Sequence, residues 1–70
     1  MEARDQLFEE FLQDLDFSLT SYLRYSEQER DEEAFQALSD AREETLDWFG
    51  CRLEANNFLR SRLALIQEEK

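Results

Sequence analysis

Hydrophobic residues recur at every third or fourth position through the first part of the chain. The uninterrupted stripe consists of Phe8, Leu12, Leu15, Leu19 and Tyr22. This spacing places the side chains on one face of an α-helix. Leu7, Phe11 and Leu23 flank the stripe and make the apolar face wide enough to pack against more than one neighbour. The pattern predicts a helix over about residues 4–26.

A polar run separates this helix from the next hydrophobic stripe. Residues 26–33 contain no apolar side chain and five acids. Ser26 and Glu29 have the spacing of a capping box, which is typical of a helix start. Acids in a first helical turn interact favourably with the positive end of the helix dipole. We therefore expect a turn at about residues 27–30 and a second helix from about residue 31.

The second stripe keeps one helical phase almost to the end of the chain. It runs through Ala34, Leu38, Ala41, Thr45 and Trp48, and continues through Arg52, Ala55, Leu59, Arg62 and Ile66. We expect one long helix over about residues 31–68. A glycine inside a helix costs about 1 kcal/mol relative to alanine, which packing by Trp48 and Phe49 can offset. The alternative is three helices, with a break in residues 50–57, near Gly50 or Asn57, because glycine commonly ends a helix and asparagine can begin one.

An antiparallel hairpin of the two helices brings large side chains against small ones. Phe8 then meets Trp48 and Phe49, and Leu12 faces Thr45, so facing layers interdigitate. The first helix runs out near Leu53, which leaves an apolar tail without a partner. An exposed apolar surface of that kind marks an interface. The predicted fold is therefore all-α: a helical hairpin with a long second helix, completed as a dimeric helical bundle, by another chain, or by the tail folding back.

Six aromatic or aliphatic residues are the candidates for partner binding. Large aromatic side chains at the centre of a helical interface are frequent energetic anchors, and Phe17 lies opposite the first stripe, where an isolated hairpin exposes it. The alternatives are ordinary core packing for the tryptophan and its neighbour, and a scattered surface hydrophobe for Phe17. The candidates are Phe17, Trp48, Phe49, Leu59, Leu63 and Ile66.

Composition narrows the class of protein. The chain has 70 residues, enough for a single small helical domain over residues 1–70. Eighteen acids against eight basic residues give a net charge of −10, which argues against direct nucleic-acid binding. Three arginines of the tail, Arg52, Arg60 and Arg62, can meet carboxylates such as Glu9, Asp14 or Asp16 in a packed assembly.

Candidate chemistry is sparse. The chain has no histidine, so Ser-His and Cys-His pairings are absent, and helical di-iron sites lose half of their ligands. It has no glycine-rich phosphate loop and no EF-hand loop. Cys51 is expected to be a small buried hydrophobe. We expect no catalytic residues, no cofactor and no metal, and hence no enzyme.

The start of the chain, Met1 to Asp5, has neither the basic character of a signal peptide nor the acid-poor character of a transit peptide. The longest uncharged run, Phe17 to Leu23, is far shorter than a membrane span. A lone cysteine fits a reducing compartment. We therefore expect a cytoplasmic protein that does not enter membranes.

Three functions remain open, and each depends on binding. The first is a small adaptor, regulator or assembly factor that acts through helix packing, with itself as a homodimer or with another protein. The second is an acidic mimic of nucleic acid that inhibits a DNA- or RNA-binding protein. Six carboxylates over residues 2–16 give roughly one charge per 4 Å of helix axis, close to a DNA strand. The acidic face of such a mimic consists of Glu9, Glu10, Asp14 and Asp16. A heteromeric secretion-type chaperone subunit is a third possibility, by analogy of architecture only.

Overall fold

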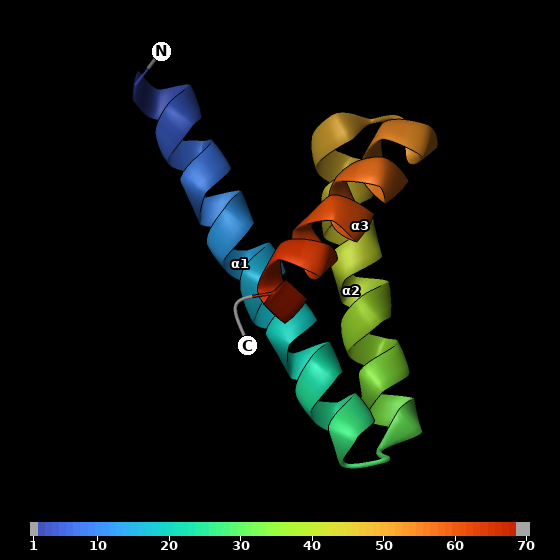
Figure 1. The fold of residues 1–70 in the computed structure, drawn as a ribbon. Coiled ribbons are helices and arrows are strands. Elements are labelled where there is room, and N and C mark those ends of the chain that lie inside the picture. Colours follow the sequence, from blue (N-terminus) through green and yellow to red (C-terminus); the bar gives the residue numbers. More distant parts are fainter. Residues whose placement is uncertain (1, 69–70) are drawn as a thin grey trace.

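The computed structural model describes residues 2–68, with side chains from Arg4 onward, so Met1, Glu69 and Lys70 lie outside the described residues. It contains three helices, α1 (Glu2–Glu27), α2 (Asp31–Phe49) and α3 (Arg52–Glu68), and no strand in this range. Figure 1 shows α1 and α2 as an antiparallel hairpin, with α3 running back along it. The molecule is elongated, 42 × 24 × 16 Å. The prediction of an all-α fold is confirmed.

The turn between α1 and α2 is closed by the backbone. The Arg30 amide donates to the Tyr25 carbonyl at 2.9 Å, and the Glu29 amide donates to the Ser26 carbonyl at 3.1 Å. This is the Schellman pattern, with Glu29 in the left-handed region at φ 61°. The predicted capping box is wrong because Ser26 belongs to the last turn of α1. Arg30 precedes α2 without a side-chain cap.

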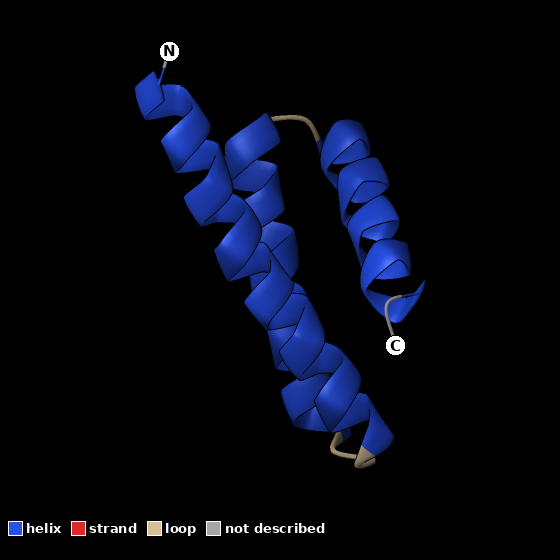
Figure 2. Ribbon diagram, turned by 60° about the vertical axis from the view of Figure 1, so that its left-hand side comes forward, coloured by secondary structure: helices blue, strands red, loops and turns tan. Residues whose placement is uncertain are grey.

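The chain reverses again at Gly50, so the long continuous helix is wrong and the three-helix alternative holds. Gly50 adopts φ 71° and ψ 3°, and its amide donates to the Leu46 carbonyl at 2.7 Å. Glycine adopts this left-handed backbone without steric cost. Asn57 lies inside α3, so no break occurs there. Cys51 is exposed in the short linker, not buried as expected. Figure 2 shows this linker joining α2 to α3.

The core lies between large side chains of α1 and small ones of the other helices. Because alanines let helix backbones approach closely, the leucines of α1 fill the space between them, as the hairpin geometry predicts. The Thr45 hydroxyl is fully buried and donates to the Ala41 carbonyl at 2.6 Å, which satisfies its polar group. The buried residues are Phe11, Leu15, Leu19, Ala34, Ala41, Thr45, Ala55 and Leu59.

An aromatic cluster joins all three helices near the α2–α3 corner. The rings of Phe8 and Trp48 are 5.4 Å apart, as expected from the hairpin register. Phe11 stacks on Trp48 with centroids 5.0 Å apart. Phe58 of α3 lies 5.0 Å from Phe49 of α2. Folding back at Gly50 therefore gives the apolar tail an intramolecular partner.

An ion pair between α1 and α3 adds to the apolar packing. Arg62 Nε and Nη2 donate to Asp16 Oδ1 and Oδ2, each at 2.7 Å. This is a bidentate guanidinium–carboxylate pair. The expected meeting of a tail arginine with a carboxylate of the first helix thus occurs within one chain.

Candidate functional site

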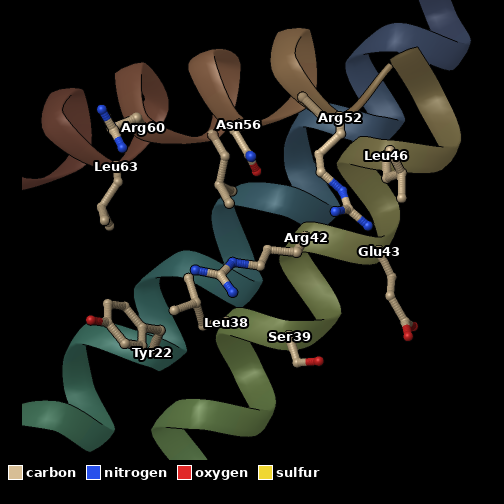
Figure 3. Close-up of a pocket in the computed structure, with 12 residues that line it drawn as sticks. Tyr22, Leu38, Ser39, Arg42, Glu43, Leu46, Arg52, Asn56, Arg60 and Leu63 are labelled. Atoms are coloured by element: carbon tan, nitrogen blue, oxygen red, sulfur yellow. The ribbon is translucent and has the colours of Figure 1, made fainter. Parts of the chain in front are cut away.

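A half-open groove lies between α2 and α3 and is closed at one side by α1. Its volume is about 580 Å³. Figure 3 shows α3 along one side of the groove and α2 along the other, with side chains from both entering the space between them. The lining residues are Tyr22, Leu38, Ser39, Arg42, Glu43, Leu46, Arg52, Ala55, Asn56, Leu59, Arg60 and Leu63.

The groove combines apolar surface with three cations. Leucines from α2 and α3 and the ring of Tyr22 supply the apolar part. Arg42 of α2 and Arg52 and Arg60 of α3 are exposed, and none forms an ion pair with another described residue. In Figure 3, Arg42 and Arg52 extend into the space between the helices. Because Arg52 and Arg60 are eight residues apart on one helix, their Cα atoms are separated by roughly 12 Å along its axis.

This positive groove stands out on an acidic molecule. α3 carries three arginines against two acids. By contrast, α1 has seven acids and two arginines, and α2 has seven acids and one arginine. Cations gathered on an otherwise negative surface create a local potential that favours an anionic partner in one orientation.

A second, shallower hollow of about 390 Å³ lies between α1 and α2 and is acidic. Its lining includes Glu10, Asp14, Glu44 and Asp47 beside Trp48. Burial raises the pKa of Glu44, and the charges of Asp14 and Asp40 raise it further. Glu44 Oε2 is buried without a hydrogen-bond partner. Among the described residues, no group of three or more potential ligands is arranged to hold a metal ion.

The six predicted partner-binding residues do not form one open surface. Phe17 is 75% exposed on α1. Trp48 and Phe49 belong to the aromatic cluster, and Leu59 is buried in the core. Trp48, Phe49 and Leu59 are covered because the reversal at Gly50 folds the tail onto the hairpin. Leu63 and Ile66 pack partly buried against the core. Contact of these residues with a partner stays a prediction.

The predicted acidic face is divided by the fold. Glu9, Glu10 and Asp14 are exposed on α1. Asp16 is half-buried and its charge is paired with Arg62. The face therefore keeps three of its four carboxylates free of a cation partner among the described residues.

Sequence reasoning missed the groove itself and several exposed hydrophobic residues. Nothing in the sequence marks Arg42 as a groove residue, because only the return of α3 places it opposite Arg52 and Arg60. The four-residue spacing of Arg52, Asn56 and Arg60 marks one helix face, but it does not reveal which helix this face meets. Phe35 at the start of α2 is 70% exposed and lies outside every predicted surface.

No protein-family model, curated protein or solved structure matches this chain. None of the described helices is both long enough and apolar enough to cross a membrane. The surface chemistry of the chain is therefore the basis for inferring its function.

Proposed function

We propose that this chain is a protein–protein interaction module that binds a helix of its partner in the groove between α2 and α3. It serves in the cytoplasm as an adaptor, regulator or assembly factor and catalyses no reaction. The observation that supports this proposal is the pairing of apolar lining with three arginines that have no ion-pair partner among the described residues. Amphipathic helices bind apolar grooves of this kind through side chains on one face.

The distribution of the cations favours an extended ligand over a compact one. A single phosphate or carboxylate needs donors that converge on one point. Arg52 and Arg60 instead lie two helical turns apart on α3, and Arg42 stands on the opposite side. Charges spread along a groove fix the register of an elongated partner, while apolar contact supplies most of the affinity.

The test is binding of a synthetic amphipathic helical peptide with leucines on one face and glutamates beside them at every second turn. We expect fluorescence anisotropy to show saturable binding to the native protein. The variant Arg52→Glu/Arg60→Glu should bind at least tenfold more weakly, because two attractive contacts become repulsive. The matched control Arg4→Glu/Arg24→Glu changes net charge equally on the exposed surface of α1. Equal weakening by both variants would refute a role for the groove.

A second candidate function is mimicry of nucleic acid by the acidic side of α1 and α2. The observation that favours it is the hollow between α1 and α2, where the carboxylates of Glu10, Asp14, Glu44 and Asp47 lie together. A mimic should displace duplex DNA from a basic, sequence-nonspecific DNA-binding domain. The variant Glu9→Gln/Glu10→Gln/Asp14→Asn should lose the displacement, and salt should weaken it steeply. Neutralising Glu32 and Glu33 on α2 instead provides the control.

A further inference from the structure

We propose that the helix bound in this groove is α1 of a second copy of the same chain, which docks through the stripe Leu7, Glu10, Asp14 and Phe17. This inference rests on the proposed function of the groove and adds the identity of the partner. It is supported by the composition of the stripe, by its match to the groove and by the places of the two surfaces on the molecule.

The stripe is a coherent exposed face of α1. Residues 7, 10, 14 and 17 follow one another at intervals of three and four, so their side chains lie along one side of the helix. Leu7 is 56% exposed, and Phe17 is the most exposed large hydrophobic residue among those described. Glu10 and Asp14 lie between them, both exposed and without a cation partner in the described range. Leu7, Glu10 and Asp14 border the shallow acidic hollow between α1 and α2, which leaves them exposed.

The stripe and the groove are complementary in charge and similar in length. Ten residues separate Leu7 from Phe17, which is roughly 15 Å of helix, against roughly 12 Å between Arg52 and Arg60. The two central carboxylates match the arginines of the groove, and the apolar ends match its leucines and Tyr22. Guanidinium groups pair well with carboxylates and tolerate contact with aromatic rings. One docked helix can therefore occupy both the charged and the apolar parts of the groove.

The stripe and the groove of one chain cannot meet. Tyr22, the residue of α1 that lines the groove, lies about 60° around the helix from Leu7 and about 140° from Phe17. Because the stripe and Tyr22 belong to the same continuous helix, a chain cannot place its own stripe in its own groove. One such contact between two copies leaves one groove and one stripe free. These two surfaces either meet each other in a reciprocal twofold dimer or bind further copies in a ring or open chain.

The net charge of −10 sets the salt dependence of this assembly. At 10 mM salt the Debye length is about 30 Å, comparable with the molecule itself, so whole copies repel each other. At 150 mM it is about 8 Å, and only the contacting charges matter. We expect self-association measured by sedimentation velocity to be weak at low salt, strongest near physiological ionic strength, and weaker again at 1 M salt.

The decisive experiment is a charge exchange between the two surfaces. Glu10→Arg/Asp14→Arg gives the stripe the sign of the groove, and Arg52→Glu/Arg60→Glu gives the groove the sign of the stripe. We expect each variant alone to associate at least tenfold more weakly than the native chain. An equimolar mixture should recover association, because each stripe then faces a groove of opposite sign. Circular dichroism checks that both variants keep their helices.

Net charge provides an internal control. The stripe variant is less negative than the native chain, so general repulsion between copies decreases, and its loss of association must come from the stripe. Association that persists in both variants, or a mixture without recovery, would overturn the inference. If the native chain stays monomeric but binds the leucine–glutamate peptide, the groove keeps its function and only the second copy is refuted. If it does neither, both proposals fall.

Discussion

Among the described residues, two hold left-handed backbone, and one of these is a glycine. Gly50 ends α2 at φ 71°, and Glu29 follows α1 at φ 61°. A side chain in this region costs roughly 1–2 kcal/mol because Cβ approaches the following carbonyl oxygen. The turn between α1 and α2 therefore stores local backbone strain at Glu29, and the turn between α2 and α3 avoids such strain at Gly50.

Reciprocal substitutions measure this strain. Glu29→Gly should raise the free energy of unfolding by up to about 1 kcal/mol, reduced in part by the greater entropy of glycine in the unfolded chain. Gly50→Ala should lower it by about 1 kcal/mol through backbone strain alone, since an added Cβ meets no atom within 4 Å. Urea denaturation followed by circular dichroism gives both values. Equal changes of the same sign in the free energy of unfolding would contradict the assignment of backbone strain to Glu29 and not to Gly50.

The buried carboxyl of Glu44 makes stability depend on pH. Its pKa in the folded state is raised above the ordinary value of 4.5, first by burial and then by Asp14 and Asp40. Folding therefore favours the protonated form, and this contribution is present below the unfolded-state pKa and lost as pH rises through the folded-state pKa. At neutral pH the ionised side chain destabilises the fold.

Glu44→Gln should consequently raise the urea midpoint at pH 7, and the gain should shrink as the pH falls toward 4. Glu43→Gln changes an exposed neighbouring carboxyl and is the control. A gain that is independent of pH would show that the glutamine acts through packing and not through charge.

At the scale of elements, the ion pair of Asp16 and Arg62 links α3 directly to α1. Both side chains are about a third exposed, so solvent screens the pair. A double-mutant cycle with Asp16→Asn and Arg62→Gln should give a coupling energy of about 1 kcal/mol or less, decreasing at 1 M salt. If the coupling energy is zero at low salt, apolar contacts alone hold α3 against the hairpin.

The hydrophobic pattern predicted the helices better than it predicted the path of the chain. Repeats of three and four residues identify the buried face of a helix, and Phe8, Leu15 and Leu19 lie where this rule places them. The same repeat runs through Gly50 unchanged, because periodicity indicates which face of a helix is apolar and not whether the helix axis changes direction. The groove could not be predicted, since its arginines come together only after α3 has turned back.

At the scale of the whole molecule, the hairpin is more firmly packed than α3. α1 and α2 share the fully buried Leu15, Leu19, Ala41 and Thr45, whereas α3 contributes only Ala55 and Leu59 to the buried set. Local opening requires less free energy where fewer apolar contacts are lost.

Hydrogen exchange with mass spectrometry should therefore show lower protection in α3 than in the centres of α1 and α2. The exchange of α3 should quicken further in Asp16→Asn, while the hairpin centres stay unchanged. Uniform protection across the three helices would mean that the chain opens only as one cooperative unit.

The separation of charge between α3 and the hairpin gives the molecule a permanent electric dipole moment. Near any positively charged support, such as an anion-exchange resin, it should adsorb with the hairpin toward the surface and the arginines of α3 facing solution. Immobilised in this way, the protein presents the groove between α2 and α3 outward. Electrostatic capture then orients the binding surface without a tag.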